Sequence, residues 1–165
     1  MKKKSYYCII ITLFFLAFNS AASAQFVKNS MYFELFGNGG LYSINYDRLF
    51  SENFGGRIGF SHISNLEFIF SSVDNITIIP ITLNYLTSSD HKFELGAGIA
   101  VVNISGGEIF GFKADKGASG VVGTGTIGYR YQPDSGGFLF RIGLTPFFAQ
   151  DGFQISGGIS LGAAF

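Results

Sequence analysis

The chain has 165 residues with 11 basic and 11 acidic side chains, so its formal net charge is zero. Charged residues make up 13% of the sequence, against about 25% in average soluble domains, and the 23 glycines are about twice the usual share. These values argue against a nucleic-acid partner, which requires a cationic patch, and against a soluble domain, whose surface requires many more charges.

The first 24 residues have the three parts of a secretory signal peptide. Lys2–Lys4 form a positive start, Tyr6–Phe18 form an apolar run, and Ala22–Ala24 provide small residues for cleavage. The apolar run has 13 residues, too few for a membrane-spanning helix, which needs about 20. The sequence therefore predicts a leader at 1–24 and one domain at 25–165.

The mature domain loses the only cysteine, Cys8, and the three leader lysines, so its formal charge becomes −3. Disulfides and thiolate ligands are then excluded. No stretch shows helical periodicity, whereas eight segments alternate apolar and polar residues and are separated by Gly, Asn, Asp, Ser and Pro clusters. The eight segments are 30–37, 40–50, 54–64, 75–87, 91–104, 119–132, 137–147 and 153–165.

Eight strands are the smallest number that closes a transmembrane barrel. The pattern therefore predicts an all-β fold, an eight-stranded antiparallel up-and-down transmembrane β-barrel. Gly37–Gly40 forms the first turn, and Pro80 predicts a bulge or local break, because proline cannot donate a ladder hydrogen bond. Residues 65–74 and 105–118 are expected to be the longer, external loops, and the connections at the other end are short.

The last segment has a fully apolar side and ends on an aromatic residue. In a soluble domain such a terminal strand would be an aggregation edge, whereas in a closed barrel it pairs with the first strand. Three apolar residues on this face, Ile159, Leu161 and Phe165, are the expected assembly signal.

The alternation places charges of both signs on the polar face, where they predict a closed network of ion pairs. The six residues are Glu34, Asp47, Arg57, Glu94, Arg130 and Arg141. The interior of an eight-stranded barrel is only wide enough for side chains to fill, so we expect a plug of charges and not an open channel. The alternative, a soluble lipocalin-like barrel, would have to expose a face composed mostly of Gly, Ser, Thr and Ala, which is a poor solvent surface.

These features together resemble the small outer-membrane β-barrel family of OmpA/OmpX/OmpW type. The resemblance is carried by the leader, the eight segments, Phe33–Leu35, Gly39–Arg48, Phe140–Pro146 and the terminal Gly162–Phe165. It implies export to the periplasm and insertion into the outer membrane as a monomer. The implied partners are outer-membrane lipid, lipopolysaccharide and the barrel assembly machinery.

One constellation predicts chemistry, because a base beside a hydroxyl, oriented by a carboxylate, is the arrangement of a serine hydrolase. His62, Ser64 and Asp74 could form it, and His62–Asn65 is similar to the His-x-Ser-Asn element of outer-membrane lipid A 3-O-deacylases. In those enzymes, however, the element lies late in the chain.

We therefore expect a non-enzymatic outer-membrane barrel with a structural or surface-interaction role. Two alternatives stay open: a lipid A-modifying hydrolase of the outer leaflet that uses His62 and Ser64, and a narrow conduit for small apolar molecules. Phosphate-loop, zinc and EF-hand spacings are absent from the sequence, and we expect no metal and no cofactor.

Overall fold

A computed structural model describes the chain over 27–68, 71–105, 107–109, 112–114, 118–149 and 152–165. Side chains are described outside 65–74 and 106–118. The predicted leader and its boundary with the barrel domain lie outside the described residues. Within the described part of the chain, no helix is long and apolar enough to cross a membrane.

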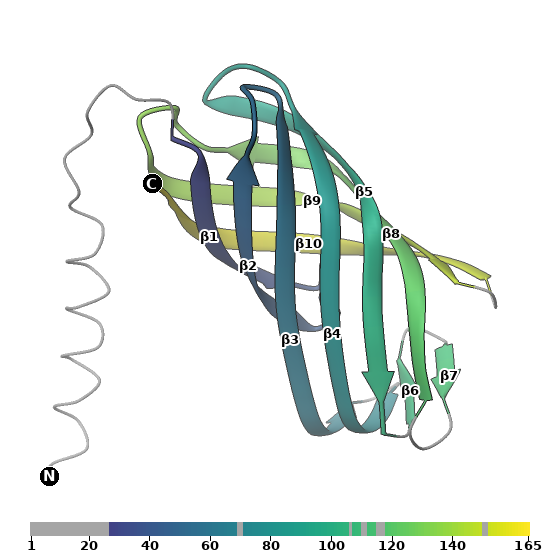
Figure 1. Cartoon of the computed structure of the whole chain (residues 1–165). Helices are drawn as coiled ribbons and strands as arrows, with labels where there is room; N and C mark the ends of the chain where they lie inside the picture. The colour runs from purple at the N-terminus through teal and green to yellow at the C-terminus, as the bar shows by residue number, and fades with distance from the viewer. Residues whose placement is uncertain (1–26, 69–70, 106, 110–111, 115–117, 150–151) are drawn as a thin grey trace, which may run out of the picture.

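Eight long strands make up most of the described part of the chain, as the alternating segments predicted (Figure 1). Their bounds are β1 Asn29–Leu35, β2 Tyr42–Leu49, β3 Phe54–Phe68, β4 Ser71–Leu86, β5 His91–Ile104, β8 Ala118–Tyr131, β9 Gly137–Ala149 and β10 Gly152–Ala164. Two three-residue strands, β6 Gly107–Ile109 and β7 Phe112–Ala114, form a small hairpin beside β4.

Each long strand pairs antiparallel with the next one, and the ladder between β1 and β10 closes the sheet into a barrel. In that seam Phe33 stands opposite Leu161, and Leu35 stands opposite Ile159. We call the end where β1 begins and β10 ends the terminal rim, and the opposite end the far rim. The fold class predicted from the sequence is confirmed.

Side chains alternate between the two faces of the barrel wall, because successive residues of a strand point to opposite sides. The inward positions of β1 are Ser30, Tyr32 and Glu34, all buried. The outward positions of all the strands are mostly large and apolar, and their exposed fraction reaches 68% at Leu83 on β4. Others of this outward set are Met31, Phe33, Ile44, Ile58, Phe60, Leu95, Ile127, Ile142, Leu144, Ile155 and Leu161. The barrel is therefore apolar outside. Inside it is polar around the buried charges, and a buried apolar cluster of Ile63, Ile76, Ile78, Ala100 and Ile104 lies towards the far rim.

The far rim differs from the prediction. The expected loop at 65–74 was wrong, since β3 continues to Phe68 and β4 begins at Ser71. The expected loop at 105–118 contains the β6–β7 hairpin. β1 and β2, by contrast, stop at Leu35 and begin at Tyr42, so this hairpin is shorter than the other three pairs of strands.

Proline interrupts two ladders without changing their register. The β3–β4 pairs stop at Ile58↔Ile81 and resume at Ser61↔Ile78, on either side of Pro80. The β8–β9 pairs stop at Thr124↔Phe147 and resume at Ile127↔Leu144, on either side of Pro146. Because proline has no backbone N–H, each ladder loses a hydrogen bond at this point.

Candidate functional site

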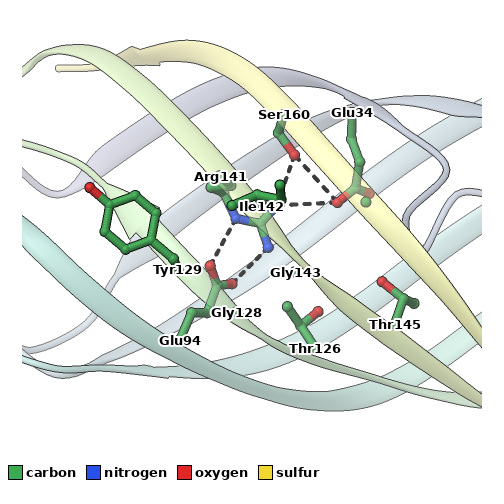
Figure 2. A pocket seen from close by; sticks show the side chains of 11 residues that line it. Glu34, Glu94, Thr126, Gly128, Tyr129, Arg141, Ile142, Gly143, Thr145 and Ser160 are labelled. Atoms are coloured by element: carbon green, nitrogen blue, oxygen red, sulfur yellow. Dashed lines mark hydrogen bonds and ion pairs between the residues drawn. The ribbon is translucent and has the colours of Figure 1, made fainter.

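The six charged residues predicted to face inward are all buried, and ion pairs bring them together in the half of the interior nearer the terminal rim. Arg141 on β9 forms a two-pronged contact with Glu94 on β5, in which Nε to Oε2 and Nη2 to Oε1 are each 2.8 Å (Figure 2). Arg141 Nη1 also donates to Glu34 Oε1 at 3.2 Å. Such parallel charge-assisted bonds are among the strongest in proteins.

The other two arginines extend this network across the barrel. Arg130 Nη1 lies 2.7 Å from Asp47 Oδ2 and 3.9 Å from Glu94 Oε2. Arg57 Nη1 lies 3.6 Å from Glu34 Oε1. Three cations therefore face three anions, which compensates the high cost of removing each charge from water.

Two more inward residues, which the prediction omitted, contribute polar contacts inside the barrel. The ring of Tyr32 lies in the middle of the network, with Arg141 Cζ 4.7 Å and Arg130 Cζ 5.9 Å from its centroid. Lys92 is buried near the terminal rim, where its Nζ lies 2.9 Å from Asp134 Oδ1. Both residues have inward parity in their strands, so the alternation contained the signal.

The turn between β1 and β2 folds into the barrel. Its Asn38 is 1% exposed and bonds to residues of the opposite wall. Nδ2 donates to Thr124 Oγ1 at 2.7 Å and to the Gly125 carbonyl at 2.9 Å, while Oδ1 accepts hydrogen bonds from Arg57 and Thr126. We call residues 36–41 the inner tip. Its Asn38 side-chain amide supplies a hydrogen-bond donor beside Pro146, whose backbone nitrogen carries no hydrogen.

Hydrogen bonds to both neighbouring strands, β10 and β3, hold the inner tip and its junction with β2 in place. Ser156 on β10 donates to the Phe36 carbonyl at 2.6 Å, and the Tyr42 hydroxyl donates to the His62 carbonyl on β3. Phe36 itself has a φ of 58°, a conformation that bulky residues rarely adopt and that costs free energy. The surrounding contacts therefore determine the shape of this turn.

Three glycines make the wall thin beside the network. Gly128, Gly143 and Gly158 stand opposite one another on β8, β9 and β10. A cavity of about 10 Å³, the space of about one water molecule, lies against them and is lined on its polar side by Glu34, Glu94, Arg141, Thr126, Thr145 and Ser160 (Figure 2).

His62 and Ser64 meet on the outward face of β3, towards the far rim. Ser64 Oγ lies 3.1 Å from His62 Nε2, and His62 Nδ1 lies 2.9 Å from Thr77 Oγ1 on β4. The backbone of Asp74 belongs to β4 and not to a loop, and its side chain lies outside the described residues. The third group beside the histidine is therefore Thr77, which the sequence reasoning missed.

The predicted assembly residues lie along the closing seam. Phe165, Leu161 and Ile159 all face outward and are exposed. Phe165 and Asn29 exchange backbone hydrogen bonds of 2.8 and 3.1 Å, which fixes the end of the chain to the start of β1.

Among the described residues, no group of three or more His, Cys, Asp or Glu side chains could hold a metal ion.

Comparison with known proteins supports the fold and nothing finer. The structure is similar to the N-terminal β-barrel domain of Pseudomonas aeruginosa OprF, with a TM-score of 0.61 and 12% identity over 86% of this chain and 98% of that one. It is also similar to the Yersinia pestis outer membrane protein Ail in a phospholipid bilayer nanodisc, with a TM-score of 0.48 and 12% identity over 84% and 99% of the two chains. No family model and no curated sequence matches the chain. The resemblance to small eight-stranded outer-membrane barrels is thus confirmed at the level of the fold.

Proposed function

We propose that this chain, which has the fold of the outer-membrane eight-stranded barrels, is an integral outer-membrane protein with a closed interior. Its role is structural or one of surface interaction, and it is neither a transporter nor an enzyme. The observation that carries the proposal is the inverted distribution of side chains, with seven buried charged residues inside and exposed large apolar residues outside. Such a surface is stable against acyl chains and unfavourable in water.

The closed interior rests on two successive layers of side chains. The ionic network fills the half of the barrel nearer the terminal rim, and the inner tip crosses the interior beside it through Asn38, Thr124 and Arg57. A conduit for small apolar molecules would have to cross both layers and separate buried ion pairs, which is strongly unfavourable. The narrow-conduit alternative is therefore the weaker one.

Further proposals follow from the placement of the barrel in the outer membrane. The leader at 1–24 directs export to the periplasm, and the barrel assembly machinery inserts the mature chain as a monomer. The outward apolar side chains then contact outer-membrane lipid and lipopolysaccharide. The terminal rim, with connections of four or five residues between strands, faces the periplasm, and the far rim faces outside.

Membrane fractionation tests the location, and gel mobility with and without boiling tests the closed barrel. We expect the protein in the outer-membrane fraction, with faster migration of the unboiled sample. Recovery in a soluble fraction would contradict the proposal.

Liposome swelling tests the closed interior. Proteoliposomes with the wild-type chain should swell in sugar solutions no faster than empty liposomes. A double variant, Asn38→Ala with Arg57→Ala, removes side chains from both layers and should raise the rate for the smallest solutes. Swelling by the wild type in proportion to the protein added would establish a conduit.

A further inference from the structure

One side chain, Asn38, binds the inner tip to the barrel interior through four hydrogen bonds. Its carboxamide donates to Thr124 Oγ1 at 2.7 Å and to the Gly125 carbonyl at 2.9 Å, and it accepts from Thr126 Oγ1 at 3.1 Å and from Arg57. We propose that the inner tip is a movable plug, and that an external molecule with a primary carboxamide displaces Asn38 and moves the tip into the barrel wall. The inference deepens the proposed surface-interaction role, and access to the tip from outside rests on the membrane placement proposed above.

The sequence of the tip favours a turn other than the one it adopts. Asn-Gly between two strands is a strong signal for a type I′ turn, which requires a positive φ at both residues and continues a hairpin without a bend. Neither Asn38 nor Gly39 has a positive φ. The left-handed conformation occurs instead at Phe36, with a φ of 58°, and at Gly40, with a φ of 81°. Because a bulky residue is strained in this conformation, the inward bend is held against the local preference of the chain.

The barrel wall has a vacant place beside the tip. The β1–β10 pairs end at Leu35↔Ile159, and the described β2–β3 pairs end at Ile44↔Phe60. Both β3 and β10 extend past these pairs towards the far rim (Figure 1). Two strand edges that no described strand covers therefore flank the tip, at the distance that the two strands β1 and β2 bridge closer to the terminal rim.

A straight hairpin fits this place with the registers already present. If both ladders continued, Gly37 would stand opposite Gly157 on β10, and Gly40 would stand opposite Ser64 on β3. Straightening the tip thus exchanges the four bonds of Asn38 for ladder hydrogen bonds with both strands. Asn38 and Gly39 would then form the two-residue loop that their sequence favours. The tip consequently has two hydrogen-bonded positions, which is the requirement for a switch.

The four partners of Asn38 define the class of ligand. A ligand shifts such an equilibrium only if it binds one position better, and a molecule that occupies the place of Asn38 binds only when the tip has left. It must accept from Arg57 and Thr126 and donate to Thr124 and the Gly125 carbonyl. A carboxylate has no donor for the Gly125 carbonyl, whereas a primary carboxamide has both functions.

The ion pairs nearer the terminal rim stay closed when the tip moves. The Glu94–Arg141 pair joins β5 to β9 and the Asp47–Arg130 pair joins β2 to β8, and neither contains a residue of the tip. The movement therefore opens a pocket towards the far rim, with the four partners of the displaced amide in its wall. It opens no conduit, in agreement with the closed interior proposed above.

The test measures how fast a water-soluble maleimide labels single cysteines in the full chain, in a Cys8→Ser background and in lipid nanodiscs. Thr124→Cys places a thiol under the tip, and acetamide should raise its labelling rate roughly 10-fold or more, because a minor conformer is populated to about 0.1–10%. Asn38→Ala should raise the same rate without any ligand. Asn103→Cys, exposed on β5, should be labelled at one rate throughout, and Ser160→Cys, buried beside the ion pairs, should stay unlabelled.

An unchanged labelling rate of Thr124→Cys in acetamide would overturn the movable plug. N,N-dimethylacetamide has no N–H group and should leave the rate unchanged, so an equal effect of both amides would overturn the carboxamide class. Free L-glutamine and the tripeptide Gly-Gln-Gly distinguish a small molecule from a peptide side chain as the source of the amide, and the more effective of the two identifies it. Labelling of Ser160→Cys would contradict the closed interior instead, and fractionation reports separately on the membrane barrel.

Discussion

Arg57 donates a hydrogen bond to the side-chain oxygen of Asn38, so a charged group of the β3 wall holds the inner tip inside the barrel. The same oxygen accepts from Thr126 at 3.1 Å on the far side of the interior. One amide thus connects the first hairpin with β3 and β8.

Removing this amide should destabilise the barrel. Asn38→Ala removes one buried acceptor of the Arg57 guanidinium, which keeps Glu34 and Thr82, and removes the side-chain donor to the Gly125 carbonyl, and we expect a loss of roughly 1–3 kcal/mol in the free energy of unfolding. Urea unfolding in lipid vesicles measures it. Asn103→Ala, at an exposed position of β5, is the control and should change stability by less than about 0.5 kcal/mol.

Replacing one partner of the Glu94–Arg141 pair should lower the free energy of unfolding more than replacing both partners. Glu94→Leu leaves Arg141 buried with reduced compensation, and Arg141→Met does the same to Glu94, so each single variant should lose about 3–5 kcal/mol. The double variant Glu94→Leu with Arg141→Met should recover much of this loss. Losses that simply add in the double variant would show that the two residues act independently.

The glycine row should not tolerate a methyl group. A Cβ on Gly143 would lie 2.7 Å from the Ile127 carbonyl oxygen and 2.9 Å from Gly128 Cα, which are backbone atoms that cannot move aside. Gly143→Ala should therefore destabilise by about 1–3 kcal/mol. Gly157 on β10 is the matched control, because the nearest atom to a Cβ there is 3.8 Å away. Equal unfolding midpoints for the two variants would contradict the predicted backbone clash.

An arginine on the outward face should lower the free energy of unfolding, by an amount that depends on its depth in the membrane. Leu144 lies near the middle of β9, and Leu144→Arg should cost about 2–4 kcal/mol in vesicles. Phe138→Arg, on the same strand near the terminal rim, should cost about 0–1 kcal/mol. The comparison needs only the two unfolding midpoints in lipid, and a larger effect at Phe138 would place the membrane belt elsewhere.

The sequence predicted those features that follow from alternation along one strand. Period two assigns Glu34, Asp47 and Glu94 to the inside because their neighbours are outward apolar residues, and no tertiary information is needed. Tyr32 had the same inward parity. Its place among the arginines was missed because alternation assigns a residue to a face but does not name the partners that it meets across the interior.

Features that depend on relations between strands could not be predicted in this way. The alternation does not say whether a turn such as 36–41 points outward or into the barrel, so the role of Asn38 was missed. Likewise, Thr77 lies beside His62 only because β3 and β4 continue to Phe68 and Ser71, which sets their register. Sequence distance alone suggested Asp74 instead.

The pairing of β1 with β10 also constrains how the protein can be made. Glu34 and Ser160 meet across this seam although 126 positions separate them. Until β10 is available, β1 has an unpaired edge and the wall remains an open sheet with one apolar face. Every shorter nascent chain is thus an incomplete ring whose open edge is prone to aggregation until the final strand pairs with it.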